Sequence, residues 1–320
     1  MRILVTGGTG FIGNHVVRRL IGEGHTVRVL VRNASTAQSL KALGAEIIEG
    51  NLLQPASLQG AAAHVDTVVH TAAVVGSGRA SVAEYYQANV AGTQTILAEA
   101  QRAGVGRFVH ISTVGVYGLG ALRRGVTEDQ PVKPVGSAYV KTKAQAEALV
   151  LASGIPSVIL RPFWITGGGD RFLIPQVATL LRANRFTLIG NGQQLWSISA
   201  VENVGDAAAL AAVHPNAPGH IYHVNDAAVP VADIMNEIAK ALNLPPIAAR
   251  TPFALAVLKN MLIYRTAPRY TVDLLFGLWK DATFSTDRIC RDLGWQPRIP
   301  WRDSLWQGTL EWQRAQGQKR

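Results

Sequence analysis

The sequence predicts an α/β protein whose parallel sheet is covered by helices on both faces. Short apolar runs alternate with amphipathic helical patterns as far as about residue 165, which is the order expected of strand, helix, strand units. A glycine-rich turn at residues 6–13 joins the first apolar run to the first helix. The rest of the chain is less regular, and we expect it to form a smaller, mostly helical region.

The composition excludes several classes of protein. The chain has 320 residues, of which 48% are hydrophobic and 16% charged, so it can bury a large core and is not a disordered chain. Its single cysteine, Cys290, excludes an internal disulfide and a thiolate metal cluster. The eight histidines lack the spacing of a zinc site, so we expect no metal.

Charge and hydropathy predict a soluble, cytoplasmic protein. The first strand follows Met1 directly and leaves no room for a signal peptide, and no apolar run reaches the roughly 18 residues of a spanning helix. The net charge of +10 is spread along the chain without a dense basic patch. A solvated basic surface is the simplest interpretation, and we expect small-molecule ligands and no nucleic acid.

The glycine-rich turn has the features of a dinucleotide-binding loop. Gly7 can adopt the positive φ of a tight turn, Gly10 lets backbone amides approach an anion, and Gly13 lets the helix lie close to the strand. Phe11 and Ile12 begin the helix, whose free amides and positive end would face a pyrophosphate. Because the turn lies at the start of a βαβ unit, it predicts a Rossmann-type, doubly wound sheet.

The end of the next strand, at 25–31, predicts NADP(H) as the cofactor. In such folds an acidic residue at this point binds the ribose hydroxyls of NAD, whereas an arginine accepts the extra phosphate of NADP. Here Val31 stands at the acid position and is followed by Arg32 and the polar Asn33. The missing carboxylate and the arginine together favour NADP(H). The alternative is that Arg32 is an ordinary loop cation.

Two further strands, at 46–48 and 67–70, flank a helix at 55–62. Ligands of an open parallel sheet bind at the carboxyl ends of its strands. These two ends carry Asn51 and Leu52 after the first strand, and Thr71, Ala72 and Ala73 after the second. A long helix at 82–103 follows, with Asn89 in its interior, where asparagine is unfavourable unless its amide has a partner.

The strand at 107–111 and the helix after it carry the candidate catalytic residues. Ser112 and Thr113 end the strand, and Tyr139 and Lys143 lie four residues apart on one face of the helix. An ammonium beside a phenol lowers a tyrosine pKa that starts near about 10. We therefore expect Tyr139 to exchange a proton near neutral pH while a cofactor moves hydride, with the Thr113 hydroxyl holding the substrate oxygen.

The strand at 157–160 runs into Pro162, Phe163 and Trp164, and the regular pattern then ends. The later elements are expected to be helices at 175–183, 203–213, 231–242, 252–262 and 301–313, and strands at 186–189 and 220–224. We assign residues 1–165 to the cofactor-binding region, with its sheet completed by about 200–225. Residues 166–199 and 226–320 would form the substrate-binding region, as a lid over the carboxyl edge of the sheet.

The sequence resembles the extended short-chain dehydrogenase/reductase family, also called the NAD-dependent epimerase/dehydratase family. The resemblance covers nearly the whole chain. It rests on TGGTGFIG at 6–13, Asn-Leu at 51–52, HTAA at 70–73, NVAGT at 89–93, Ser-Thr at 112–113 before VYG at 116–118, Tyr139 with Lys143, LRP at 160–162 and DLGWQP at 292–297.

The resemblance implies a role for each motif residue. Tyr139 would be the acid/base, Lys143 would bind the nicotinamide ribose and lower the tyrosine pKa, and Thr113 would be the hydroxyl partner. Asn89 would support the site structurally, and Asn51 stands where many members have an aspartate near the adenine. The expected cofactor-binding set is Gly7, Gly10, Phe11, Ile12, Gly13, Arg32, Asn33, Asn51, Leu52, Thr71, Ala72, Ala73, Asn89, Tyr139, Lys143, Pro162 and Phe163.

Departures from the family's patterns narrow the reaction. Members that dehydrate nucleotide sugars carry an acidic pair after the catalytic threonine, where this chain has Val114 and Gly115. Sugar-nucleotide epimerases usually have an asparagine three residues after the arginine of the Arg-Pro motif, where this chain has Trp164. An aromatic there offers apolar contact area in place of an anion-binding amide, so we expect Trp164, with Ser112, to meet the substrate. The alternative is that Trp164 belongs to the core.

Segments 201–204 and 222–226 resemble the 3β-hydroxysteroid and sterol dehydrogenase branch, relatives that act on 3-oxoacyl compounds, and dihydroflavonol-reductase-like proteins. The leucine- and aromatic-rich region 252–279 would suit a hydrophobic lid, ordinary helical packing or, less favoured, contact with a membrane surface. Helices at 82–103 and 137–152 would form a homodimer, as in many family members.

We therefore predict an NADP(H)-dependent oxidoreductase that interconverts a secondary alcohol and a ketone. Its substrate would be a mainly apolar small molecule, such as a sterol-like, 3-oxoacyl-like or flavonoid-like compound. The alternative is a nucleotide-sugar epimerase, in which the same groups oxidise and re-reduce one carbon. A third hypothesis is a regulator or assembly factor that binds the cofactor and performs no chemistry.

Overall fold

A seven-stranded parallel sheet forms the centre of the protein. The computed structural model describes residues 1–75, 80–121, 123–263 and 279–318. The strand order is β10-β6-β5-β4-β1-β2-β3. The strands are β1 (Arg2–Thr6), β2 (Thr26–Val31), β3 (Glu46–Glu49), β4 (Thr67–His70), β5 (Arg107–Ile111), β6 (Ser157–Pro162) and β10 (Ile221–Val224). The order reverses at β1, so the predicted doubly wound sheet and the return of the chain at β10 are both confirmed.

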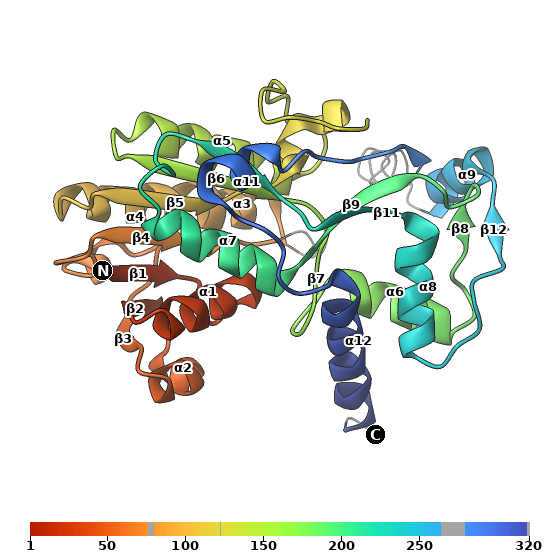
Figure 1. Cartoon of the computed structure of the whole chain (residues 1–320), viewed down its shortest axis with the longest axis horizontal. Coiled ribbons are helices and arrows are strands. Elements are labelled where there is room, and N and C mark those ends of the chain that lie inside the picture. The colour runs from red at the N-terminus through yellow and green to blue at the C-terminus, as the bar shows by residue number, and fades with distance from the viewer. Residues whose placement is uncertain (76–79, 122, 264–278, 319–320) are drawn as a thin grey trace.

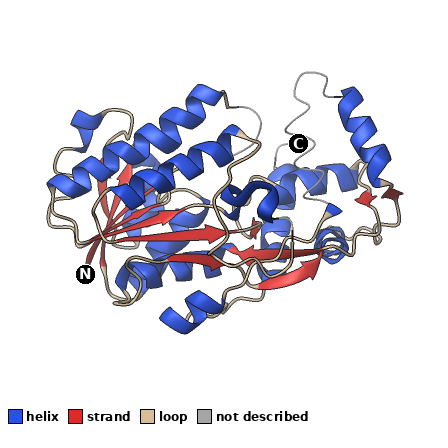
Figure 2. Cartoon of the chain, turned by 90° about the horizontal axis from the view of Figure 1, so that it is seen from above, coloured by secondary structure: helices blue, strands red, loops and turns tan. Residues whose placement is uncertain are grey.

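Helices cover both faces of this sheet (Figure 1, Figure 2). One face carries α1 (Phe11–Gly22), α2 (Gln38–Ala42) and α7 (Val201–Val213), and the other carries α3 (Val82–Tyr86), α4 (Gly92–Arg102) and α5 (Ala138–Ala152). Alternate strand residues enter different cores, as the twofold period of a strand requires. In β1, Ile3 and Val5 pack with the first group of helices, and Leu4 packs with the second.

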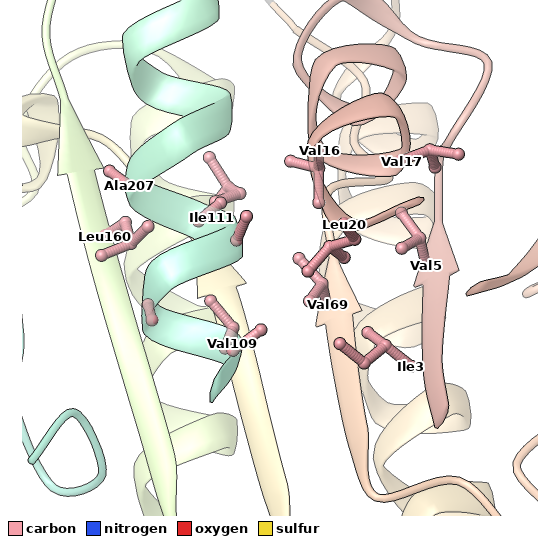
Figure 3. Packing of buried hydrophobic residues seen from close by; sticks show 14 of the residues in the cluster. Ile3, Val5, Val16, Val17, Leu20, Val69, Val109, Ile111, Leu160 and Ala207 are labelled. Carbon is pink, nitrogen blue, oxygen red and sulfur yellow. The ribbon is translucent and has the colours of Figure 1, made fainter. Parts of the chain in front are cut away.

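Helices α1 and α7 lie side by side on the sheet. Figure 3 shows Val16, Val17 and Leu20 of α1 over β1 and β4, and Ala207 of α7 over β5 and β6. A glycine allows the two helices to approach, because a Cβ atom at Gly205 would lie 2.7 Å from the Cβ of His15. This close contact holds the returning chain of α7 against the helix that follows the glycine turn.

Most of the C-terminal elements gather at one end of the main sheet, and α11 lies over the sheet itself (Figure 1). A three-stranded sheet contains β7 (Ile165–Thr166), β9 (Leu195–Ala200) and β11 (Ala227–Pro230), and a two-stranded one contains β8 (Leu188–Ile189) and β12 (Arg250–Thr251). The helices are α6 (Leu173–Arg182), α8 (Val231–Ala241), α9 (Phe253–Ile263), α11 (Asp287–Leu293) and α12 (Trp301–Gly317). Helices α6, α8 and α12 surround a separate core that includes Trp196, Ile234 and Leu305, whereas α11 packs into the core of the main sheet.

Three expectations about local structure need correction. The helix expected at 55–62 is a short 3-10 turn, Pro55–Leu58, because Gln59 has an extended ψ of 119° and ends the helical path. The helix expected at 82–103 contains a π-helical turn, Gln87–Ala91. Strands β9 and β11 were not expected at all. Strand β9 is buried over nearly its whole length, so it lacks the alternation of a half-exposed strand.

The region 252–279 is described only in part. Its first half contains α9, and residues 264–278 lie outside the described part of the chain, so the hypotheses of a lid or a membrane contact stay predictions. Within the described ranges, no helix is both long and apolar enough to cross a membrane.

The packing in Figure 3 predicts how stability responds to loss of a core side chain. Leu20 is fully buried between α1 and the sheet, so Leu20→Ala should lower the free energy of unfolding by about 2–5 kcal/mol through lost burial and a residual cavity. Leu43, which is 40% exposed, gives the matched control, and Leu43→Ala should cost no more than about 0.5 kcal/mol. Equilibrium urea denaturation measures both changes, and equal losses would contradict this packing.

Candidate active site

The predicted site residues lie along one edge of the main sheet, at the carboxyl ends of its strands. The turn after β1 carries Gly7, Gly10, Phe11, Ile12 and Gly13, and the ends of β2 and β3 lead to Arg32, Asn33, Asn51 and Leu52. Thr71, Ala72 and Ala73 follow β4, Ser112 and Thr113 follow β5, and Phe163 and Trp164 follow Pro162 of β6. The strand order reverses between β1 and β4, which is the usual position of the ligand crevice in such sheets.

The glycine turn fits tightly between its own helix and the loop after β4. Gly7 has a φ of +73°, and a Cβ atom there would lie 2.7 Å from the backbone nitrogen of Ala72. At Gly13, a Cβ atom would lie 2.2 Å from the carbonyl oxygen of Gly7. Gly10 is the N-cap of α1, and among the described residues no side-chain cap binds the amides of the first turn. Those amides remain free to bind a phosphate, so the turn fits a dinucleotide.

The ends of β2 and β3 carry two charged residues, Arg32 and Glu49, where the adenosine ribose of a dinucleotide is expected. Arg32 is exposed directly after β2. The carboxylate of Glu49, on the neighbouring strand, accepts a hydrogen bond from the Ala34 amide at 2.6 Å. Asn33 Oδ1 accepts one from the Ser35 amide at 2.9 Å. Sequence reasoning missed Glu49, although its place at the end of the adjacent strand was a usable signal.

Asn51 also turns its side chain to the local backbone. Its Oδ1 accepts a hydrogen bond from the Leu53 amide at 3.0 Å, and the backbone nitrogen of Asn51 donates to the hydroxyl of Ser57 at 2.9 Å. Leu52 lies close to Gly92 at the start of α4. A Cβ atom added at Gly92 would lie 3.4 Å from the Leu52 Cβ. These contacts fix the loop after β3, and an adenine contact by Asn51 stays a prediction.

A buried chain of hydrogen bonds starts at the last residue of β1. Thr93 Oγ1 donates to the Asn89 carbonyl at 2.7 Å, so it accepts from His70 Nε2 at 3.0 Å. His70 Nδ1 is then the acceptor for Thr6 Oγ1 at 2.6 Å. Burial lowers the pKa of His70 to about 3, so this ring stays neutral. The chain connects the strand before the glycine turn to the π-helical turn that carries Asn89.

Asn89 connects that turn to the helix of the catalytic candidates. Its Oδ1 accepts from the Val74 amide at 2.7 Å, and its Nδ2 donates to the Val74 carbonyl at 3.0 Å and to Thr142 Oγ1 at 3.1 Å. Thr142 lies on α5 between Tyr139 and Lys143. Every polar atom of the buried Asn89 amide thus holds a structural element, which explains an asparagine inside a helical segment.

Thr113 and Tyr139 are brought together by the approach of α5 to the loop after β5. A hydrogen bond joins the two side chains, and the ring of Tyr85 lies 6.4 Å from that of Tyr139. Burial raises the pKa of Tyr139 to about 12, against the smaller opposite effect of the Thr113 hydrogen bond. These protein contacts alone raise the Tyr139 pKa, and the expectation that Lys143, helped by an oxidised nicotinamide, lowers it towards neutrality stays a prediction.

Lys143 is a buried cation held by the end of β5. Its side chain is 3% exposed, and its Nζ donates to the Ile111 carbonyl at 2.5 Å and lies 3.1 Å from His110 Nε2. Burial lowers the pKa of Lys143 to about 8, and the negative charge of Glu147 acts in the opposite direction. Burial and the Lys143 charge also move the pKa of His110 well below its usual range, so its imidazole is neutral.

Ser112 and Trp164 occupy different surroundings. Ser112 is 3% exposed, and its Oγ has no hydrogen-bond partner within the described residues. Trp164 has a φ of +32°, which is rare for a bulky residue, and its ring lies 4.7 Å from Trp196 and 6.2 Å from Phe163. Trp164 is half-buried against the C-terminal core, so both of its expected roles, core packing and substrate contact, remain compatible with its position.

Fold and site together define the class of protein. A glycine turn shaped for a dinucleotide and a threonine, tyrosine and lysine set at the same sheet edge are the parts of an α/β oxidoreductase. The sequence model of the NAD dependent epimerase/dehydratase family matches residues 3–225. The chain belongs to this family, the extended short-chain dehydrogenases/reductases.

Three relatives that match nearly the whole chain are named as reductases or as a dehydrogenase. A 4-hydroxy-2-methyl-3-oxo-4-farnesyl-3,4-dihydroquinoline-1-oxide ketoreductase from Stigmatella aurantiaca is 34% identical over 95% of each chain. A 2-alkyl-3-oxoalkanoate reductase from Stenotrophomonas maltophilia is 33% identical over 95% of this chain and 97% of the relative. A 3 beta-hydroxysteroid dehydrogenase/Delta 5-->4-isomerase from Mycobacterium tuberculosis is 30% identical over 95% of this chain and 88% of the relative.

A solved structure has the same fold. It is a short-chain dehydrogenase/reductase superfamily protein from Agrobacterium tumefaciens with bound NAD, with 25% identity, a TM-score of 0.73 and coverage of 100% of both chains. The expected resemblance to the family and to its 3β-hydroxysteroid dehydrogenase branch is confirmed.

The glycine turn generates a prediction for cofactor binding. Gly13→Ala should weaken dinucleotide binding at least about tenfold, or about 1.4 kcal/mol, because the new Cβ displaces the Gly7 carbonyl and with it the turn. Gly22→Ala is the matched control at the other end of α1, where a Cβ would meet nothing within 4 Å. It should leave binding unchanged. Calorimetric titration with NADPH and NADH measures both, and normal binding by Gly13→Ala would contradict the assignment.

Proposed function

We propose that this protein is an NADP(H)-dependent reductase of ketones on mainly apolar small molecules. The observation that carries the proposal is the grouping of Thr113, Tyr139 and Lys143 at the sheet edge where the glycine turn would hold a dinucleotide. The proposal is also supported by the relatives, whose names describe a ketoreductase, a 3-oxoalkanoate reductase and a hydroxysteroid dehydrogenase.

Tyr139 supplies the proton. Like any phenol, its hydroxyl carries a proton throughout the neutral range and can donate it to a ketone oxygen. Thr113, already bonded to Tyr139, orients the same oxygen. A reduced nicotinamide, when bound, supplies the hydride for the carbonyl carbon. Transfer of the Tyr139 proton to the oxygen then completes a secondary alcohol. We propose reduction as the direction because two relatives are named as reductases.

Aromatic and small residues support an apolar substrate. Trp164 presents part of an indole ring beside Trp196 and Phe163. Val114 and Gly115 stand where the dehydrating members of the family carry acids, so the groups that sugar dehydration requires are missing. A ketone on a ring system or on an alkyl chain would bury its carbon framework against these rings.

Arg32 supports NADP(H) over NAD(H), and Glu49 is the opposing feature. The exposed guanidinium can bind a 2′-phosphate, whereas the solved relative from Agrobacterium tumefaciens holds NAD. One carboxylate oxygen of Glu49 already accepts a hydrogen bond from the Ala34 amide, so it is less available to the ribose hydroxyls. We therefore keep NADP(H) as the proposed cofactor.

The alternatives differ in what happens to the cofactor. A nucleotide-sugar epimerase would return the hydride to its substrate and need no added NADP(H), and a non-catalytic regulator would bind NADP(H) without turnover. A homodimer through α4 and α5, a cytoplasmic location and the absence of a nucleic-acid partner all stay predictions.

Removal of the Tyr139 hydroxyl tests the proposed acid. Tyr139→Phe should lower the rate of NADPH-dependent ketone reduction by about 100- to 10,000-fold while NADPH binding remains, because only the proton donor is lost. Tyr86→Phe, at a tyrosine that is 52% exposed on α3, is the matched control and should keep the wild-type rate. Reduction of 3-oxoacyl and cyclic ketones is followed by NADPH absorbance. Undiminished turnover by Tyr139→Phe would contradict the mechanism.

The cofactor preference is tested at Arg32. Arg32→Ala should raise the Kd for NADPH by about tenfold to a hundredfold, the usual effect of losing hydrogen bonds to a charged group. The Kd for NADH should stay the same, so the wild-type protein's affinity for NADH serves as the internal control. Equal Kd values for NADPH in the wild-type and variant proteins would refute the role of Arg32.

A further inference from the structure

A buried ion pair lies one helical turn beyond Lys143. Arg161 of β6 and Glu147 of α5 are 2% and 3% exposed, and two parallel hydrogen bonds join them, Nε to Oε1 at 3.0 Å and Nη2 to Oε2 at 2.5 Å. A charged pair in a protein interior costs much of its attraction in desolvation, so it is weak evidence of stability alone. Sequence reasoning singled out the Arg-Pro motif but missed Glu147, although Glu147 lies four residues after Lys143.

The pair continues into a fully satisfied row of hydrogen bonds. Arginine can only donate, so Nη1 of Arg161 donates to the Tyr117 oxygen at 2.7 Å. Tyr117 donates in turn to His223 Nε2 at 2.6 Å, and His223 Nδ1 donates to the Ser285 carbonyl at 3.1 Å. Burial lowers the pKa of His223 to about 3, which keeps this ring neutral and the direction of the row fixed.

The row connects α5 to the C-terminal core. Tyr117 stacks on Phe284, with ring centroids 6.4 Å apart, and the His223 amide donates to Glu128 Oε1 at 2.9 Å. Phe284 belongs to the same core as Trp196. The helix that carries the catalytic candidates is therefore held to the proposed substrate-binding region through side chains that the proposed chemistry does not use.

Charged and titratable groups face Lys143 from several elements. Tyr139 and Glu147 lie on its own helix, one turn before and one turn after it. His110 lies on β5, with His70 of β4 stacked behind it at 5.5 Å, and both rings are neutral. Arg161 of β6 is neutralised by Glu147. Glu147 is thus the anion of this set that shares a helix face with the buried ammonium, without a direct ion pair between these two described residues.

We propose that Glu147 and Arg161 are positioning residues that keep Lys143 charged inside the protein and hold its helix against β6. Arg161 donates a hydrogen bond to each oxygen of Glu147, so the carboxylate is held in one orientation. The inference rests on the proposed function only in giving Lys143 a role at the cofactor. The charge of Lys143 can be measured without substrate or turnover.

Direct titration of Lys143 tests the proposal. The 13Cε signal of Lys143 is followed by NMR from pH 6 to 11 and assigned by its loss in Lys143→Met. In Glu147→Gln the pKa of Lys143 should fall by about one unit or more, because a neutral amide replaces the anion and Arg161 is left as an unpaired cation. The NADPH affinity of Glu147→Gln should therefore begin to decline at a lower pH than the affinity of the wild-type protein.

Tyr117→Phe is the matched control. It breaks the same row by leaving Arg161 Nη1 and His223 Nε2 without the phenol, yet changes no charge near Lys143. It should lower thermal stability and leave the Lys143 titration as in the wild-type protein. If Glu147→Gln titrates as the wild-type protein does, or if Tyr117→Phe shifts the lysine equally, the proposal is overturned.

A double variant decides the case in which Glu147→Gln does not fold. Glu147→Met with Arg161→Met removes both charges and keeps the volume filled, which buried ion pairs often tolerate. The Lys143 pKa should again fall, but by less than in Glu147→Gln because no unpaired arginine cation remains, and an unchanged pKa overturns the proposal. A protein that reduces no ketone but shows these shifts would refute the proposed function and leave this inference standing.

Discussion

The contact between the glycine turn after β1 and the loop after β4 is the constraint on which the rest of the site depends. At Gly7 and Gly13 the backbones approach so closely that a single added Cβ would lie within 2.8 Å of a neighbouring backbone atom. The buried chain of Thr6, His70 and Thr93 then carries this geometry to Asn89. From Asn89 it reaches α5, so the cofactor cradle and the catalytic helix are placed by one connected set of contacts.

The electrostatics of the site follow from burial. The Tyr139 phenol keeps its proton, the imidazoles of His70 and His110 stay neutral, and Lys143 is the buried cation among them. A buried ammonium is costly unless hydrogen bonds and an opposite charge compensate for lost water. The Ile111 carbonyl accepts a hydrogen bond from the ammonium, and we propose that Glu147, held by Arg161, supplies the opposite charge. Burial also raises the pKa of Tyr139, so its phenol holds the proton that ketone reduction requires.

Local patterns in the sequence predict the parts of this structure that local physics controls. The glycine turn, the alternation of strands and helices, and the face shared by Tyr139 and Lys143 depend on residues close together in the chain. The direction of the Tyr139 pKa depends on what buries the side chain, which spacing does not show. The same holds for the pairing of Glu147 with Arg161. Strand β9 was missed because both of its faces are covered by distant segments.

The central claim is a net transfer of hydride to a ketone, and isotope transfer tests it most directly. The wild-type protein is incubated with NADPH deuterated at the transferable position of the nicotinamide, together with 3-oxoacyl and cyclic ketones, and in a parallel reaction with nucleotide sugars. The account predicts one deuterium on the new carbinol carbon for each NADPH oxidised. Epimerised nucleotide sugar with no consumption of NADPH, and no labelled alcohol from any ketone, would contradict it.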